Sequence, residues 1–468
     1  MVPGSNPWAY AYAGHQFGSF AGQLGDGRAI SLGEVVNTRG RRWELQLKGA
    51  GMTPYSRFAD GYAVLRSSIR EFLCSEAMFH LGIPTTRALA LIGSSRIVQR
   101  EQDESGAIVC RLAPSWIRLG NFELFYATGD SENLQKLADY AITMHFPEIQ
   151  PPDGSVDGPQ TGKYTQLLER VVAKTAEMIA HWQAYGVMNT DNFSILGLTI
   201  DYGPFQFLDG YDPDYVCNKS DFTGMYAFSE QPEVGLRNMV KFATAISPLI
   251  IQECGGDREK ASGELRPALN QYSSILSDRY GRLMAKKIGL ATYKETDLQD
   301  VIYPLLTIIA KEAVDYTLFF RSLSQFSIAS TDALYPTEAC SRTGPTEPRL
   351  IIAQAKPSLG AALQPWLEIY RKRLLEDISG PDESCPLVTA SREAERRKQM
   401  DSINPRYILR NHLAQTVIEA AEVGNYAEVN ELLNVLSRPF EDGSIQEQER
   451  WGGAVPDWAA GVKCSCSS

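Results

Sequence analysis

The stretch Asn189-Thr190-Asp191-Asn192-Phe193-Ser194-Ile195-Leu196-Gly197-Leu198-Thr199-Ile200-Asp201-Tyr202-Gly203 decides how this chain is interpreted. It sets a carboxylate and an amide on one loop, then a short apolar hairpin, then a second carboxylate close to a glycine. Carboxylate and amide oxygens are hard ligands that suit Mg²⁺ or Mn²⁺. An Asx-rich turn alone would explain residues 189–192, but converging acids indicate a cation between them. We therefore predict a metal site here.

The spacing matches that of kinase-type phosphoryl-transfer sites. There, an Asn of the catalytic loop and an Asp close to a glycine hold the metal. In this chain Asp191 directly precedes Asn192, and no His-Arg-Asp triplet stands upstream. The sequence thus predicts the metal-binding half of such a site, with Asn192 and Asp201 as ligands, and an altered proton-accepting half.

Composition excludes several classes of protein. The chain has 468 residues, 44% hydrophobic and 22% charged, which is typical of a globular protein with two or three packed units. Its net charge of −11 argues against non-specific binding to nucleic acid or to a membrane surface. We see no apolar run long enough to span a bilayer and no signal peptide.

The eight cysteines are too scattered for a secreted disulfide framework. Most are expected to be buried thiols. Cys464 and Cys466, on the terminal tail, are either exposed thiols open to redox chemistry or part of an inert end. The composition favours neither alternative.

Two regions of different pattern follow each other, which predicts an α+β, bilobal fold. Up to about residue 126 the pattern is of strands and turns around one helix. After residue 130 it is largely helical, interrupted by the loop and hairpin at 185–215. We expect strands at 28–37, 41–48, 86–93, 96–101 and 106–113, the first two as a hairpin. We expect one early helix from the caps Ser67-Ser68 to His80, ended by Gly82 and Pro84, and later helices near 234–251, 259–286, 298–323, 360–376, 390–401, 406–422 and 426–437.

The corresponding domains are an N-lobe at 1–126, a helical C-lobe at 127–403 and a C-terminal segment at 404–468. The C-lobe contains the catalytic and metal loop, 185–205. Such a junction between a strand-rich and a helical lobe suits a nucleotide site.

Several residues before the junction are candidates for contacting a nucleotide. Gly25, Gly27 and Arg28 precede a strand, and glycines let backbone N–H groups approach phosphates, although such a stretch is more often only a turn. Lys48 ends an alternating strand. It is either a solvated lysine or a phosphate contact held by a helix carboxylate.

Glu71 and Glu76 on the predicted helix are the candidate partners for that lysine. Arg111 lies in an otherwise apolar strand, where a guanidinium must find a partner or point into a cleft. Together with Arg118 it either clamps phosphate oxygens or forms a structural ion pair.

The chain resembles the selenoprotein O family of protein adenylyltransferases, also called the YdiU family. Matching words run from near residue 3 to about 250 and again over 404–468. They include Tyr12-Ala-Gly-His-Gln-Phe-Gly18, Gly22-Gln-Leu-Gly-Asp-Gly-Arg-Ala29, Trp43-Glu-Leu-Gln-Leu-Lys-Gly-Ala-Gly51, Thr53-Pro-Tyr-Ser-Arg-Phe-Ala-Asp-Gly61, Gly186-Val-Met-Asn-Thr-Asp-Asn192 and Asp201-Tyr-Gly-Pro-Phe205.

The resemblance implies a kinase-like fold that binds ATP, its co-substrate, in a flipped orientation. AMP then passes to a Ser, Thr or Tyr hydroxyl of a protein, with Mg²⁺ or Mn²⁺ as cofactor. Carried over residue by residue, the resemblance implies a phosphate loop of Gly25, Gly27 and Arg28, a phosphate contact at Lys48 that pairs with Glu71 rather than Glu76, and phosphate clamps at Arg111 and Arg118. It places Asp60 and Gly61 beside the nucleotide, makes Asp191 the proton acceptor, and makes Asn192 and Asp201 the metal ligands. It also implies redox-active thiols at Cys464 and Cys466, with another body cysteine such as Cys254 as an alternative partner.

Departures from the family define the competing hypotheses. The segment from Trp182 to Gly186 is shorter than usual, Tyr62 replaces an Arg, and the amino end is expected to be missing. A kinase transferring the γ-phosphate and an inactive scaffold with redox-active thiols are the alternatives. By family we expect protein substrates, no nucleic-acid or membrane partner, a monomer, and a mitochondrial location in eukaryotes or a cytoplasmic one in bacteria.

Overall fold

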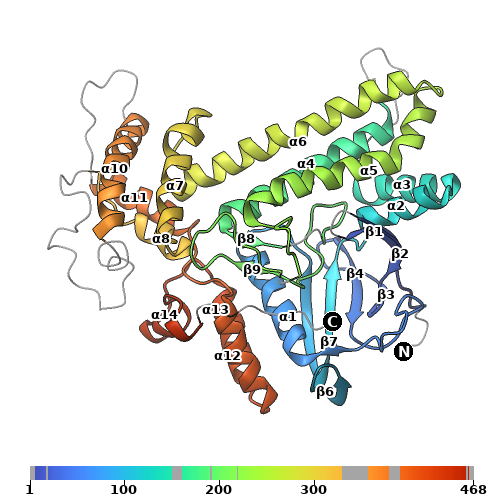
Figure 1. The fold of residues 1–468 in the computed structure, drawn as a ribbon, viewed down its shortest axis with the longest axis horizontal. Helices are drawn as coiled ribbons and strands as arrows, with labels where there is room; N and C mark the ends of the chain where they lie inside the picture. Colours follow the sequence, from blue (N-terminus) through green and yellow to red (C-terminus); the bar gives the residue numbers. More distant parts are fainter. Residues whose placement is uncertain are drawn as a thin grey trace.

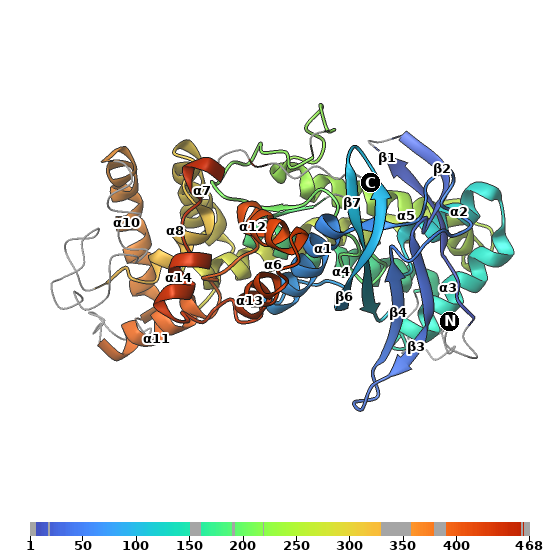
Figure 2. The ribbon, with the colours of Figure 1, turned by 90° about the horizontal axis from the view of Figure 1, so that it is seen from below.

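The computed structural model describes residues 6–16, 19–149, 161–189, 192–218, 220–328, 357–378, 390–459 and 462. A strand-rich N-terminal part lies beside a larger helical part, and the last helices return to the N-terminal part (Figure 1). This arrangement is the α+β, kinase-like bilobal fold expected from the sequence. Seen from below, α12 and α13 lie next to α1 (Figure 2).

The N-terminal sheet has the strand order β3-β4-β7-β5, with β6 also pairing with β7. Its strands are β3 (Ala29–Val36), β4 (Arg42–Lys48), β5 (Ala63–Val64), β6 (Arg87–Gln99) and β7 (Asp103–Ala113). The predicted hairpin is confirmed, since β3 and β4 pair antiparallel from Ala29↔Lys48 to Val36↔Arg42. The strands expected at 86–93 and 96–101 form one strand, β6, whose register shifts between Gly93 and Ile97.

Helix α1 (Leu65–His80) packs under β6 and β7. The cap expected at Ser67-Ser68 is wrong, because the chain passes directly from β5 into the helix and Val64 takes the N-cap position without a side-chain hydrogen bond. The helix ends as expected, with Gly82 in the left-handed region at φ 77°.

A second hairpin and a second early helix were not foreseen. β1 (Ala11–Gln16) and β2 (Ser19–Gly25) form their own two-stranded sheet, which packs on α2 (Leu119–Thr128). The approach is close enough that a Cβ on Gly120 would lie 2.0 Å from the carbonyl oxygen of Ala13. Glycine at 120 therefore lets the hairpin reach the start of α2.

The helical part is built on α4 (Lys163–Tyr185), which packs along both α5 (Gln231–Glu253) and α6 (Arg258–Lys287). α3 (Ser131–His145) covers α2 and α5. In the chain, α4 and α5 are separated by a segment that contains the two-stranded sheet of β8 (Val187–Met188) and β9 (Gln206–Phe207).

The helix expected at 298–323 is interrupted. It consists of a π-helical turn, η2 (Leu298–Ile302), then α7 (Tyr303–Lys311) and α8 (Tyr316–Leu323), with Ala313 at φ 46° breaking the run. Four further helices correspond to predicted ones. They are α10 (Pro357–Ile378), α11 (Ala390–Asp401), α12 (Asn411–Glu422), which begins later than the predicted residue 406, and α13 (Ala427–Leu436). The helix α14 (Ile445–Trp451) was not predicted.

The C-terminal segment is tied to both lobes. α12 and α13 contact α1 of the N-lobe. Arg410, at the start of α12, forms ion pairs at 2.9 Å with Asp209 and Asp315 of the helical lobe.

Lys287 at the end of α6 is buried without a carboxylate partner among the described residues. Its ammonium lies 5.0, 5.5 and 4.7 Å from the ring centroids of Tyr185, Tyr316 and Phe320. Burial lowers its pKa to about 7.

Among the described residues, one helical stretch, Phe228–Glu253, is long and apolar enough to cross a membrane, which corrects the expectation that no such run exists. Its most apolar window is 56% buried against the rest of the fold, as in the core helix of a globular domain.

Candidate active site

Strand β4 buries its polar face. Glu44, Gln46 and Lys48 are 4%, 1% and 8% exposed, whereas the alternating Leu45 and Leu47 are only half-buried. The interpretation of Lys48 as a solvated lysine is therefore wrong. Burial of three polar side chains in a row requires partners inside the fold, and these partners define the site.

Lys48 is held by two carboxylates. It forms an ion pair with Glu71 of α1, and its ammonium lies 2.8 Å from Asp201. Glu76, one turn further along α1, instead pairs with Arg87 at 2.6 Å and accepts a hydrogen bond from the backbone N–H of Ala88. The two acids of α1 thus face different partners, and Glu71 is the one that reaches Lys48.

Arg111 of β7 also reaches the carboxylate of Asp201. Its guanidinium is 2.5 Å from Asp201 and 2.9 Å from Glu71, and it also donates to Gln46. The side chain is 3% exposed and lies over the ring of Trp116. An arginine fork bonded in this way has little freedom to move.

Arg118 supplies a third cation from the N-cap of α2. It donates to Asp201 at 2.6 Å and to the side-chain oxygen of Asn192 at 3.2 Å. It also lies over the ring of Tyr12 and 3.9 Å from Asp26. Arg118 therefore links the two predicted metal ligands.

The hairpin foreseen between residues 193 and 200 brings those ligands together. The N–H of Ile200 donates to the carbonyl of Asn192 at 2.9 Å, so Asn192 and Asp201 become neighbours. The Asn189 amide donates to the Asp201 carbonyl at 3.3 Å. Asp191, the predicted proton acceptor, lies outside the described residues, as do Cys464 and Cys466.

The charges of the cluster favour an ionised Asp201. Burial alone would raise its pKa, but the three surrounding cations hold the pKa well below its ordinary value. Asp26 shows the opposite behaviour, because burial raises its pKa against the effect of Arg118 and Arg111. Its carboxylate accepts from Gln46 at 3.2 Å. Asp26 and Gln46 belong to the site but were not predicted, although Gln46 stands on the polar face of the alternating strand.

The glycine-rich turn lies directly beside Lys48. The N–H of Gly49 donates to the carbonyl of Arg28 at 2.7 Å. A Cβ on Gly25 would meet the Tyr55 ring at 2.3 Å, and one on Gly27 would lie 3.1 Å from the Tyr55 carbonyl. Glycines are thus needed here for close packing by the loop that follows β4.

Asp60 and Gly61 take a different place. Asp60 forms an ion pair with Arg100 at 2.8 Å and accepts from the N–H of Tyr62. Within the described part of the chain, no hydrogen bond or ion pair joins either residue to the cluster around Asp201.

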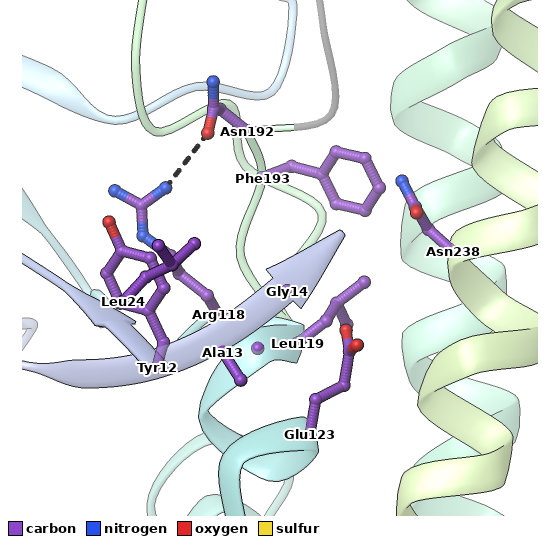
Figure 3. Close-up of a pocket in the computed structure, with 11 residues that line it drawn as sticks. Tyr12, Ala13, Gly14, Leu24, Arg118, Leu119, Glu123, Asn192, Phe193 and Asn238 are labelled. Atoms are coloured by element: carbon purple, nitrogen blue, oxygen red, sulfur yellow. Dashed lines mark hydrogen bonds between the residues drawn. The ribbon is translucent and has the colours of Figure 1, made fainter. Parts of the chain in front are cut away.

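A pocket of about 230 Å³ opens beside Arg118 and Asn192 (Figure 3). It lies between the β1 strand, the start of α2 and α5. Its polar lining includes Glu123 and Asn238, and its aromatic lining Tyr12 and Phe193.

The residues present fit a metal that is shared with phosphate. The described residues contain no group of three or more His, Cys, Asp or Glu side chains that could hold an ion alone. Asn192 and Asp201 offer two hard oxygen ligands. This suits Mg²⁺, which is commonly bound by one or two protein oxygens together with substrate phosphates and water.

The fold and the cluster together define a kinase-like, two-lobed protein. A strand lysine paired with a helix glutamate faces a loop asparagine and aspartate across the lobe junction. The family model described as "Protein adenylyltransferase SelO" matches residues 2–437. The chain belongs to this family, and it is an enzyme of the nucleotidyltransferase class.

Curated relatives agree over nearly the whole chain. A protein named "Protein nucleotidyltransferase YdiU" from Rhodopirellula baltica is 41% identical over 98% of this chain and 83% of its own length. Proteins of the same name from Cupriavidus pinatubonensis and Aeromonas salmonicida are 44% and 43% identical, over 99% and 100% of this chain and 83% and 88% of their own lengths.

Proposed function

We propose that this protein transfers AMP from ATP to Ser, Thr or Tyr hydroxyls of protein substrates, with ATP bound in a flipped orientation and with Mg²⁺ or Mn²⁺. One observation carries the proposal: the interior of the site around Asp201 is polar and cationic. Gln46, Arg111 and Asp26 are 1%, 3% and 6% exposed there. Gln46, Arg111 and Asp26 are already hydrogen-bonded to one another. A ligand must therefore match the charge of the adjoining cations, which the oxygens of a terminal phosphate would do and an uncharged purine base would not.

In this orientation the cations serve the leaving group. Lys48, Arg111 and Arg118 would neutralise the β- and γ-phosphates, with the loop residues Gly25, Gly27 and Arg28 beside them. Asp60 and Gly61 would lie at the outer rim, near the nucleoside. Asn192 and Asp201 would hold the metal, which supplies Lewis-acid stabilisation of phosphate charge when bound.

The transfer step is balanced without further reactants. The acceptor hydroxyl oxygen forms a bond to the α-phosphorus, and the bond from that phosphorus to the bridging oxygen breaks. Pyrophosphate leaves with the electron pair. Asp191 would take the hydroxyl proton.

ATP labelled separately at the α- and γ-phosphates tests the proposal. We expect α-label on acceptor protein, dependent on Mg²⁺ or Mn²⁺ and lost in Asp201→Asn. Label from the γ-position alone would identify a kinase. Nucleotide binding without transfer of either label would identify an inactive scaffold.

A further inference from the structure

The loop between β4 and β5 exposes apolar side chains next to the glycine-rich turn. Phe58 is 99% exposed and Met52 is 65% exposed, and Arg57 between them is also exposed. Single exposed apolar residues are common on protein surfaces and need no explanation. This loop, however, is held firmly in place at its base, along its body and at its tip.

The base of the loop is closed. Ala50 and Tyr62 form an antiparallel bridge, and the N–H of Gly51 donates to the carbonyl of Gly61 at 3.2 Å. Gly61 has φ 74°, and a Cβ on it would lie 2.2 Å from the Gly51 carbonyl oxygen. The two ends therefore meet as in a compact Ω-loop rather than a loose connection.

The body of the loop is bonded to the glycine-rich turn. The Thr53 hydroxyl donates to the carbonyl of Asp26 at 2.7 Å, and the Ser56 hydroxyl donates to the carbonyl of Gly27. Tyr55 covers Gly25. The aromatic side chain that faces the glycine-rich turn is thus Tyr55, and Phe58 faces solvent.

The tip of the loop carries backbone strain. Arg57 has φ 57°, which is uncommon for a residue with a side chain, and the N–H of Ala59 donates to the carbonyl of Ser56 across it. Strain of this kind persists where surrounding bonds enforce it, and it concentrates at functional sites. Here the backbone turn at Arg57 sets the position of Phe58 on the surface.

We propose that the loop 51–61 docks the protein acceptor, with Phe58 and Met52 entering an apolar hollow on that protein and Arg57 meeting carboxylates at its edge. The proposal rests on the function proposed above. An acceptor hydroxyl must enter at the rim of the nucleotide site. Because the loop ends at Asp60 and Gly61, which we place at the outer rim, a protein held by Phe58 lies at that rim.

Kinetics with Phe58→Ala test the docking role. The probe is α-labelled ATP with a dialysed soluble bacterial protein extract as acceptor, varied in concentration. We expect the extract concentration that gives half-maximal labelling to rise roughly tenfold, as for loss of one buried aromatic contact. Affinity for ATP, measured by calorimetry with a non-hydrolysable analogue, is expected to stay within about twofold.

Phe222→Ala is the matched control, since Phe222 is 95% exposed. We expect it to leave acceptor labelling unchanged, and thermal melting should show both variants folded. An unchanged acceptor KM in Phe58→Ala overturns the docking role alone. So does a selective loss of ATP affinity, which would place Phe58 against the nucleoside, or an equal rise in Phe222→Ala. If the wild type transfers no α-label, the proposed function and the docking role fall together.

Discussion

The ammonium of Lys48 lies 2.8 Å from the carboxylate of Asp201, although 153 residues separate them in the chain. Arg111 and Arg118 reach that carboxylate from β7 and from the start of α2. One side chain thus sets the spacing of three cations taken from three elements. A fixed set of charges of this kind stabilises phosphate without reorganisation during reaction.

Replacing Asp201 by asparagine keeps the shape of the side chain and removes its charge. We expect AMP transfer to fall by at least about 100-fold, the usual scale for losing a preorganised electrostatic group. The measurement is the initial rate of α-label transfer at saturating ATP. Asp214→Asn, an exposed acid on the following loop, is expected to retain the wild-type rate.

The two acids of α1 should separate by function. Glu71→Gln weakens the grip on Lys48 and Arg111, so we expect a higher KM for ATP and a slower transfer. Glu76→Gln weakens the pair with Arg87, so we expect a loss of about 1–3 kcal/mol in the free energy of unfolding. Urea unfolding and transfer kinetics on both variants check this. Equal kinetic defects in the two folded proteins would contradict the assignment.

Arg111→Lys tests whether the guanidinium fork matters beyond its charge. A lysine keeps the positive charge but cannot donate in the same geometry to Gln46, Glu71 and Asp201. We expect a loss of about 1–3 kcal/mol in the free energy of unfolding, because buried acceptors lose their donors. Arg42→Lys, whose partner Glu34 is half exposed, should change this free energy by less than about 0.5 kcal/mol.

Lys287 predicts a pH-dependent stability. Its pKa is about 7 in the folded protein against an ordinary value of 10.5, so between these values the unfolded chain binds more protons. Stability contributed by this group must therefore rise as pH increases from about 7 to 10.5. The three ring faces oppose the shift by favouring the ammonium.

We expect Lys287→Met to be more stable than the wild type near pH 7 and to lose much of that advantage at about pH 9.5. Thermal melting at the two pH values measures the difference. Lys136→Met, at an exposed lysine, should show no such convergence. A constant gap between Lys287→Met and the wild type would show that the lysine stays charged throughout.

Local sequence patterns predicted where the strands and helices lie better than they predicted which faces of these elements are buried. The β3–β4 hairpin followed from strand alternation, which is a local feature. Which face of β4 is buried did not follow, because the partner that satisfies Gln46 is Arg111, 65 residues away. An alternating strand normally turns its apolar face inward, and here tertiary partners reverse that preference.

In the same way, the sequence predicted most of the charged residues of the site but not which other charged residues are buried. Lys48, Glu71, Arg111, Arg118, Asn192 and Asp201 were all named from the sequence, and the structure brings them together. Asp26 was not predicted, because the local sequence of a glycine-rich turn does not indicate that its acid is buried. Lys287 was missed because a lysine near a helix end ordinarily lies in solvent.

The return of the C-terminal helices to α1 has a mechanical consequence. α12 and α13 lie against α1, while Arg410 anchors α12 to Asp209 and Asp315 of the other lobe. Because the C-terminal segment connects the two lobes at a second place, hinge opening of the lobes is restricted. We therefore expect substrates to enter and leave by movement of loops at the lobe junction, while the distance between the lobes stays nearly constant.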